Sequence, residues 1–323
     1  MPAGRSLKKM LELDKVSKIY KTGAFGGKKL VAVNNVSFSL KDGEVASLIG
    51  ESGSGKSTIG KMILKLISID SGTIKYNGQD INNLKGNDLK EYYKDVQGVF
   101  QDPFSSYNPI FKADRIFRII REEFFPEISS KEWYEKVEKA LYDVGLNPGD
   151  VLNKFPHQLS GGQLQRFLIA RALLLDVNFL VADEIISMLD ASTRIDVLNL
   201  LAELKKRGLS VLFITHDLSL GYYISEKAII LYRGCVLESG ITEKIFDNPL
   251  HPYTKMLMAS VPRLDKKWEK VKLELKAKQA ETENKCVYYD RCPYAKKDER
   301  CSNPEIVEAE EGHFVACCHY GEV

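Results

Sequence analysis

The chain has 323 residues, of which 44% are hydrophobic and 28% charged, which is enough apolar material for a globular core. Its 46 basic and 44 acidic residues give a net charge of +2, so the sequence offers no electrostatic case for binding nucleic acid. No apolar run approaches the ~20 residues that span a bilayer. No hydrophobic stretch follows residues 1–5, so we expect no secretion signal.

The N-terminal third predicts strands followed by a phosphate-binding loop. Residues 7–40 are typical of strands, because residues 33–40 alternate between apolar and polar side chains. Residues 45–49 predict a buried strand, and apolar spacing over 59–67 predicts a helix. Between them the sequence fits G-x-x-x-x-G-K-[ST] without mismatch. This loop comprises Gly50, Glu51, Ser52, Gly53, Ser54, Gly55, Lys56, Ser57 and Thr58.

The loop chemistry follows from its residue types. Glycines let backbone N–H groups turn toward phosphate oxygens, and the helix N-terminus adds partial positive charge. Lys56 is expected to reach the β- and γ-phosphates, and the Ser57 hydroxyl to hold Mg²⁺. A chance glycine-rich turn would lack the flanking strand and helix that both appear here.

The rest of the chain predicts an α/β core with a helical insertion. Asn77-Gly78 indicates a hairpin turn, residues 110–175 have helical spacing, and residues 195–204 predict an amphipathic helix. Short buried strands are expected at 179–182 and 211–214. This alternation favours an α/β fold. The highly charged residues 264–285 predict a solvated helix or linker before a cysteine-rich tail.

An acidic pair follows the predicted strand at 179–182. Asp183 is positioned to bind Mg²⁺, and Glu184 to orient and deprotonate the water that attacks the γ-phosphate. A strand followed by a surface acidic pair is common by itself. The phosphate loop favours the catalytic interpretation, since loops of this class work opposite such a strand.

The segment Ser160-Gly161-Gly162-Gln163 adds glycines at a predicted helix start, where Ser160 can cap the helix. Placed between a phosphate loop and an Asp-Glu strand, Leu-Ser-Gly-Gly-Gln resembles the signature of ATP-binding cassette (ABC) ATPases. The resemblance implies an ABC-type core with a mixed sheet and an antiparallel β subdomain. It also implies a head-to-tail pair of subunits that binds ATP between the phosphate loop of one and the signature of the other.

Further elements of that family occur in the expected order. Gln101 matches the glutamine that senses Mg²⁺ and the transport partner, and residues 187–190, ending in Asp190, resemble the D-loop. His216 matches the switch histidine that contacts the γ-phosphate, although a lone histidine at a strand end is usually structural. Tyr20 matches the aromatic residue that stacks on adenine, although a strand tyrosine ordinarily only packs.

Two segments, 101–109 and 251–262, and the insertion 22–30 resemble the ATPases of oligopeptide and dipeptide importers. The chain departs from the family at Ile185-Ile186, where Pro-Thr is usual, and at Met188, where Ala is usual. Neither Pro nor Thr performs the chemistry, so the role of Glu184 is unaffected. Met188 falls where two subunits would meet, so it affects the expected interface.

Five of the six cysteines lie in the last 38 residues, beginning at Cys286. Because disulfides are rare in cytosolic proteins, this clustering favours a metal site over free buried thiols. The resemblance to importer ATPases implies a [4Fe–4S] cluster, and the paired C-x₂-C spacing of zinc ribbons is missing. The expected ligands are Cys286, Cys292, Cys301 and Cys317, with Cys318 as the alternative fourth ligand. A zinc site that includes His313 or His319 stays open.

We therefore expect an ABC ATPase domain over residues 1–263, with a helical subdomain at about 105–170, followed by a charged linker and cysteine-rich tail over 264–323. The resemblance implies ATP, Mg²⁺, two transmembrane permease subunits, a second and paralogous ATPase subunit, and indirectly an extracellular solute-binding protein. It places the chain on the cytoplasmic face of the cell membrane. Import of oligosaccharides or nickel, or a soluble nucleic-acid-associated ATPase, are the alternatives.

Overall fold

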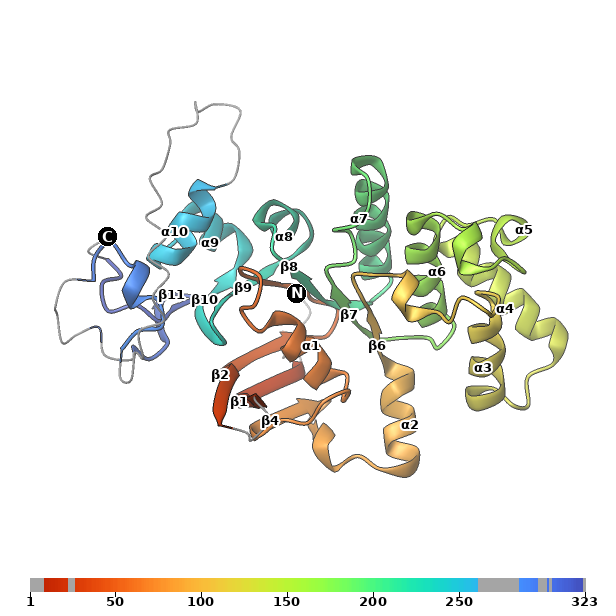
Figure 1. Cartoon of the computed structure of the whole chain (residues 1–323), viewed down its shortest axis with the longest axis horizontal. Coiled ribbons are helices and arrows are strands. Elements are labelled where there is room, and N and C mark those ends of the chain that lie inside the picture. The colour runs from red at the N-terminus through yellow and green to blue at the C-terminus, as the bar shows by residue number, and fades with distance from the viewer. Residues whose placement is uncertain (1–8, 23–26, 261–284, 296–300, 302–303, 322–323) are drawn as a thin grey trace, which may run out of the picture.

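The structure is a computed structural model that describes residues 9–22, 27–260, 285–295, 301 and 304–321. Figure 1 shows a central sheet, an antiparallel sheet close to the N-terminus, a helical arm at one end and the cysteine tail at the other. No helix in these ranges is long and apolar enough to cross a bilayer. The predicted linker falls largely within residues 261–284, which lie outside the described residues.

The N-terminal sheet has four strands in the order β2-β1-β4-β5. All its pairs are antiparallel, which confirms the expected antiparallel subdomain. Asn77 and Gly78 have φ angles of 50° and 84°, which suit the tight turn predicted between β4 and β5. The bounds are β1 Lys9–Thr22, β2 Lys28–Lys41, β4 Ser71–Tyr76 and β5 Gln79–Asp80.

The central sheet has eight strands in the order β11-β12-β10-β9-β3-β8-β7-β6. Strands β9, β3, β8, β7 and β6 run parallel, so their carboxyl ends share one edge of the sheet. Every residue of β3, β7 and β8 is buried, as continuous apolar runs predict. The bounds are β3 Val45–Ile49, β6 Val96–Val99, β7 Phe179–Asp183, β8 Ser210–Thr215, β9 Lys227–Tyr232, β10 Cys235–Ile241, β11 Val307–Glu310 and β12 His313–Val315.

The helical arm holds α3 to α6 beyond the edge strand β6 (Figure 1), which confirms the expected helical insertion. Ser129 begins α4 with a capping box, since its side chain accepts from the N–H of Glu132 while the Glu132 carboxylate accepts from the N–H of Ser129. The helices are α1 Lys56–Ile63, α2 Gly86–Asp95, α3 Arg115–Phe124, α4 Ser130–Asp143, α5 Pro148–Val151, α6 Gly161–Leu173, α7 Ala191–Lys206, α8 Leu218–Ile224, α9 Thr242–Asp247 and α10 Pro252–Ala259.

Helix α1 ends four residues earlier than the apolar spacing predicts. Lys65 has a φ of 52°, and the N–H groups of Lys65 and Leu66 donate back to the carbonyls of Met62 and Lys61. These two bonds form a Schellman end, here with lysine at the left-handed position that glycine usually fills. Leu66 is 57% exposed, so the prediction that the helix continues to residue 67 was wrong.

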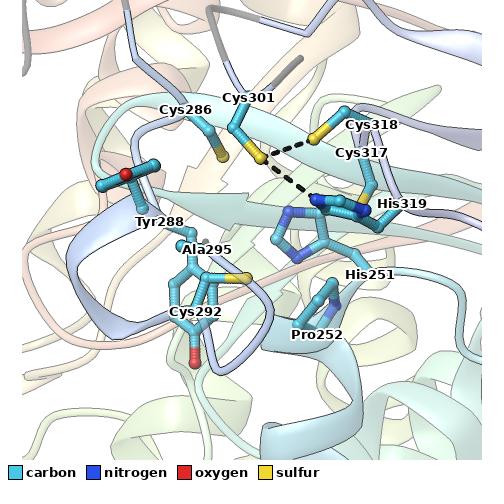
Figure 2. A pocket seen from close by; sticks show the side chains of 11 residues that line it. His251, Pro252, Cys286, Tyr288, Cys292, Ala295, Cys301, Cys317, Cys318 and His319 are labelled. Carbon is cyan, nitrogen blue, oxygen red and sulfur yellow. Dashed lines mark hydrogen bonds between the residues drawn. The ribbon is translucent and has the colours of Figure 1, made fainter. Parts of the chain in front are cut away.

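The described part of the tail joins the central sheet through β12, which pairs with β10. His313 Nε2 lies 2.7 Å from Glu238 Oε1, and both side chains are fully buried. The Glu238 carboxylate also accepts from the N–H groups of Leu250 and His251. These bonds fasten the tail to the core, and its cysteines gather in one pocket beside α10 (Figure 2).

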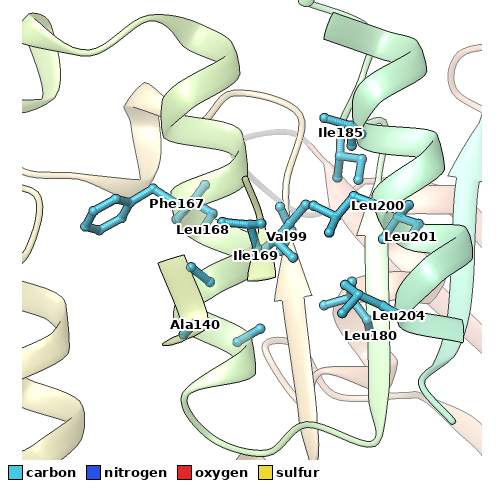
Figure 3. Packing of buried hydrophobic residues seen from close by; sticks show 14 of the residues in the cluster. Val99, Ala140, Phe167, Leu168, Ile169, Leu180, Ile185, Leu200, Leu201 and Leu204 are labelled. Carbon is cyan, nitrogen blue, oxygen red and sulfur yellow. The ribbon is translucent and has the colours of Figure 1, made fainter. Parts of the chain in front are cut away.

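The buried apolar residues form three clusters. The largest lies between the helical arm, α7 and strands β6 to β8 (Figure 3). A second packs α1 and the N-terminal sheet against the other side of the central strands. The third includes Tyr253 of α10 and Tyr288 of the tail, so the tail shares apolar core with the central sheet. Together the clusters hold the parallel strands, and hence the residues at their carboxyl ends, in fixed positions.

Candidate active site and cysteine pocket

The phosphate loop joins the carboxyl end of β3 to α1. Lys56 is 4% exposed, and its ammonium donates to the carbonyl oxygens of Gly50 at 2.8 Å and Glu51 at 2.9 Å. Burial lowers the pKa of Lys56, and the carboxylates of Glu184 and Asp183 oppose that shift. Gly55 has a φ of 104°, and a Cβ there would lie 2.4 Å from the carbonyl oxygen of Ala32, so only glycine fits.

The remaining loop residues stay candidates for the predicted phosphate cradle. Gly53 has a φ of 79°, and Gly50 approaches the Leu231 carbonyl so closely that a Cβ would lie 2.1 Å from its oxygen. The buried Ser54 hydroxyl has no hydrogen-bond partner among the described residues. Ser52, on the exposed side of the loop, and Thr58, in the first turn of α1, complete the predicted set.

The predicted magnesium residues meet across the sheet. Ser57 Oγ donates to Asp183 Oδ1 at 3.1 Å, which joins the start of α1 to the end of β7. Burial raises the pKa of Asp183, and the hydrogen bond from Ser57 opposes the shift. A serine hydroxyl and a carboxylate are both hard oxygen ligands, which suit Mg²⁺.

Glu184 and His216 lie beside this pair. Glu184 Oε1 is 3.4 Å from His216 Nδ1, and His216 directly follows β8. Glu184 has a φ of 50°, which is uncommon for a side chain that is not glycine. Its N–H donates to Ile214, and its carbonyl accepts from the N–H and hydroxyl of Ser187. These bonds hold the Glu184 backbone in a strained conformation of the kind often found at catalytic positions.

Gln101 and Tyr20 occupy the predicted segments. Gln101 is exposed and comes just after β6. Because β6 runs parallel to β7, Gln101 lies at the same edge of the sheet as Asp183. Tyr20 lies on β1 opposite Leu30 of β2, with the ammonium of Lys18 5.8 Å from its ring centre. The roles of Gln101 toward Mg²⁺ and of Tyr20 toward adenine stay predictions.

The signature segment begins α6. Ser160 Oγ accepts from the N–H of Gln163 at 3.1 Å, and Gln163 Oε1 accepts from the N–H of Ser160 at 2.9 Å. A Cβ on Gly162 would lie 2.5 Å from the Thr193 side chain, and Gly161 faces Leu189. The signature is therefore packed against the start of α7. Figure 1 shows that β6 and β7 separate it from α1 of the same chain.

The D-loop and its neighbours have two distinct surroundings. Asp190 caps α7 and accepts from Ser192 and Thr193, and these bonds lower its pKa well below the usual range. Ile185 and Ile186 are buried in the largest apolar cluster, in which Figure 3 shows Ile185 on the side of α7. The aliphatic replacements of Pro-Thr are thus explained by core packing, whereas Met188 is 62% exposed.

All five tail cysteines line one pocket (Figure 2). Cys301 Sγ lies 2.8 Å from Cys318 Sγ and 3.4 Å from His319 Nε2, and the three ligand atoms lie within 4.8 Å of one another. Burial raises the pKa of Cys286 and of Cys317 to about 11, and their thiol neighbours add to the shift. Burial also raises the pKa of Cys292 and Cys318.

This pocket brings together the predicted ligands and the alternative. Cys286, Cys292, Cys301 and Cys317 line it together with Cys318. Of the two histidines that kept zinc open, His319 lines the pocket, whereas His313 bonds to Glu238 instead. The sequence prediction missed His251 and Tyr288 as lining residues. The signal for His251 was its place in the 251–262 segment.

Comparison with known proteins gives two family matches. The model described as "ABC transporter" matches residues 33–187, and "Oligopeptide/dipeptide transporter, C-terminal region" matches residues 237–301. The chain is 42% identical to the oligopeptide transport ATP-binding protein AppF of Bacillus subtilis, over 96% of this chain and 97% of that protein. It is 38% identical to OppF of Haemophilus influenzae, an oligopeptide transport ATP-binding protein, over 89% and 88%.

Solved structures give the same fold. A dimeric ATP-binding cassette in a post-hydrolysis state, bound to ADP and phosphate, is 30% identical with a TM-score of 0.65. The match covers 72% of this chain and 99% of that one.

Proposed function

The chain belongs to the family of ABC transporter ATP-binding proteins, and on that premise we propose that it is the ATP-hydrolysing subunit of an importer for dipeptides or oligopeptides. The observation that carries the ATPase activity is the contact between Ser57 and Asp183, with Glu184 and His216 beside it. The peptide substrate is supported by the oligopeptide/dipeptide C-terminal match over residues 237–301 and by the named relatives.

Each of these side chains has a proposed role in ATP hydrolysis. Glu184 would accept a proton from the water whose oxygen attacks the γ-phosphorus, and the bond from that phosphorus to the oxygen bridging to ADP breaks. His216 would contact the γ-phosphate, and Lys56 would turn from the loop carbonyls toward the β- and γ-phosphates. Mg²⁺, held by Ser57, Asp183 and Gln101, would neutralise phosphate charge.

We assign the signature to a phosphate site on a second ATPase subunit. The N-terminus of α6 presents the N–H groups of its two glycines beside the capped N–H of Gln163, and the signature lies away from the phosphate loop of its own chain (Figure 1). A head-to-tail pair, with a paralogous partner, would bring the two together. Binding of ATP closes the pair only in so far as ATP binds the closed state better than the open one.

A mixing experiment tests this arrangement. Ser160→Arg should disable the site built on the partner's phosphate loop and leave the loop of the mutated chain active. Mixed with a normal partner, the pair should keep one of two active sites, as measured by ATP trapping at each loop. Loss of the mutated chain's own loop would contradict the head-to-tail pair.

The segment after Gln101 supports docking of a permease subunit, one of the two expected, from the cytoplasmic side of the membrane. Phe104, Ile110 and Phe111 are exposed, large and apolar, and all follow Gln101 within ten residues. Exposed apolar side chains concentrated in one short segment favour an interaction surface, since such surfaces are rich in exposed apolar area. A permease helix seated here would connect transport to the glutamine beside the magnesium residues.

Substrate class is tested by uptake. The chain, its partner ATPase, the permeases and the solute-binding protein would be reconstituted in vesicles with internal ATP. We expect uptake of labelled oligopeptides, with no uptake of labelled oligosaccharides or Ni²⁺. Uptake of either alternative in place of peptides would transfer the proposal to that substrate. Tight nucleic-acid binding with steep salt dependence would instead revive the nucleic-acid alternative, which the net charge of +2 disfavours.

We further propose that Cys286, Cys292, Cys301 and Cys317 hold a [4Fe–4S] cluster. The donor set fits, since the pocket collects these four thiols. Thiols whose pKa is raised by burial become thiolates at neutral pH only beside a positive centre, which a metal provides. Such a cluster would cross-link a segment too short to form its own core. Anaerobically purified protein should contain about four irons per chain, whereas one zinc per chain would favour Cys301, Cys318 and His319 as zinc ligands.

A further inference from the structure

Glu51, in the phosphate loop, is held by the cysteine tail. Both of its carboxylate oxygens accept from Arg291: Nη1 lies 2.9 Å from Oε2 and 3.1 Å from Oε1, and Nη2 lies 3.1 Å from Oε1. This is the bidentate geometry that makes arginine–carboxylate pairs directional. The two residues are 240 positions apart in the sequence.

The backbone of Glu51 is held by the C-terminal region as well. Its N–H donates to the hydroxyl of Tyr253, a fully buried side chain of α10, at 3.0 Å. The Arg291 guanidinium lies 5.8 Å from the ring centres of both Tyr232 and Tyr288. Rings at this distance attract a cation and limit its freedom, so the arginine is fixed before any ligand binds.

Arg291 is itself positioned by the cysteines. It ends the short turn η4 (Tyr289–Arg291), which lies between Cys286 and Cys292. The N–H of Tyr289 donates to the carbonyl of Cys286, and the N–H of Cys292 donates to that of Tyr289. The N–H of Cys286 donates to the carbonyl of Cys301. The turn that carries the guanidinium is therefore bonded directly to the residues that line the pocket.

We propose that Arg291 is a positioning residue for the phosphate loop, through which the cysteine tail sets the affinity for ATP. Lys56 donates to the Glu51 carbonyl while Arg291 binds the Glu51 carboxylate, so both cations act on one loop residue. With Arg291 in place, the carboxylate is neutralised and turned toward the tail. Without it, a negative charge beside the loop would repel phosphate and compete for Lys56.

Because Arg291 acts through Glu51, a double-mutant cycle tests the inference. The variants are Arg291→Gln, Glu51→Gln and the double variant, and the readouts are the Kd for Mg-ATP by titration, kcat, KM and thermal unfolding. We expect Arg291→Gln to weaken ATP binding about fivefold, a value reduced from that of a buried charged pair because Glu51 is 39% exposed. The KM should rise with little change in kcat.

In the Glu51→Gln background, Arg291→Gln should change the Kd less than twofold, since the charge that it neutralises is gone. An equal loss in both backgrounds, or no loss in either, would overturn the inference. Arg207→Gln is the matched control, because Arg207 pairs with Asp143 on the surface away from the loop. It should leave the Kd unchanged.

The experiment distinguishes a folding defect, and a failure of the proposed function, from a failure of the inference about Arg291. If Arg291→Gln does not yield folded protein, Arg291→Lys retains a cation and replaces it in the cycle, with a smaller loss expected only when Glu51 is present. Equal effects of Arg291→Lys in the two backgrounds would again overturn the inference. The inference rests on ATP binding by this loop, so failure of the unsubstituted chain to bind ATP would count against the proposed function, whereas an additive cycle counts only against Arg291.

Discussion

The nucleotide site and the cysteine pocket are built in opposite ways. The phosphate loop, His216 and Gln101 follow the carboxyl ends of parallel strands, and Asp183 is the last residue of another; those strands are neighbours in the central sheet. The cysteine pocket draws its side chains from short segments around one turn, docked on β10 and α10. The residues of the first site are therefore positioned by the sheet, whereas those of the second are positioned by the docking of the tail.

The two regions nevertheless meet at Glu51. The tail is fastened to the core by the buried His313–Glu238 pair and reaches the phosphate loop through Arg291. If the central sheet alone positioned the nucleotide site, changes in the tail would not affect ATP binding. The contact at Glu51 predicts that ATP binding depends on both regions. Substitutions at the nucleotide site should have large effects on ATP binding or turnover, and substitutions in the tail should have small but measurable effects.

The largest effect is expected at Glu184. Glu184→Gln should lower ATP turnover by about 10²- to 10⁴-fold, the range attributed to a general base, because the water loses its proton acceptor. The Kd for ATP should stay close to that of the unsubstituted chain, since the phosphate loop is intact, and the ATP-bound pair should accumulate. Turnover and nucleotide titration measure the two quantities.

Glu122→Gln is the matched control for that variant, because Glu122 is an exposed carboxylate in the helical arm. It should retain full turnover. Wild-type turnover in Glu184→Gln would remove Glu184 from its catalytic role and leave the Ser57–Asp183 contact without a base.

The next effect is expected at Lys56. Lys56→Ala removes a buried cation that would bind the β- and γ-phosphates, so the Kd for ATP should rise by about 10- to 100-fold, as loss of a charged hydrogen bond predicts. Direct titration with Mg-ATP measures it. Lys131→Ala, at an exposed lysine of α4, should leave the Kd unchanged. An unchanged Kd in Lys56→Ala would place the phosphates elsewhere.

The contrast between the two regions also explains what the sequence could predict. Buried parallel strands leave continuous apolar runs, so β3, β7 and β8, and the positions of Ser57, Asp183 and Glu184 at or near the ends of such strands, could be predicted from local sequence. The contact between Ser57 and Asp183 then follows from topology, because carboxyl ends of parallel strands share one edge.

Long-range side-chain contacts left no such signal. Arg291 and Glu51 are 240 positions apart, and neither lies in a pattern that points to the other. The cysteines could be recognised as a candidate site because they are clustered in the sequence. The position of His251 in the same pocket could not be predicted, because it depends on how α10 packs against the tail. The early end of α1 was missed because Lys65 adopts a left-handed backbone that apolar spacing does not encode.

A smaller effect is expected from breaking the pocket. Cys292→Ser should lower the iron content well below about four per chain, because a four-thiolate cluster loses one ligand. Since Cys292 directly follows Arg291, we expect the Kd for ATP to rise only about two- to threefold, far less than in Lys56→Ala. Iron analysis and absorbance of the anaerobic protein measure the cluster content, and ATP titration of the same preparation measures the Kd.

Cys235→Ser is the control for the pocket, since Cys235 lies on β10 and its sulfur accepts from Asn34. It should keep full iron content and affinity. Full iron in Cys292→Ser would remove that residue from the ligand set and favour Cys318, which already lies 2.8 Å from Cys301. Loss of ATP binding as severe as in Lys56→Ala would mean that the two regions are one site.

The smallest effect is expected at Met188, which belongs to the nucleotide region but points outward. Because the side chain is 62% exposed, Met188→Ala should change the free energy of unfolding of the single chain by less than about 0.5 kcal/mol. A partner subunit that covers this side chain would bury apolar surface, so ATP-dependent pairing should weaken about threefold. Ile195→Ala, at an exposed position on α7, is the control and should leave pairing unchanged. Sedimentation of the Glu184→Gln background with ATP measures the pairing. Equal pairing in Met188→Ala and its parent would show that the methionine faces solvent in the closed pair, and that the departure from alanine at this position has no part in partner choice.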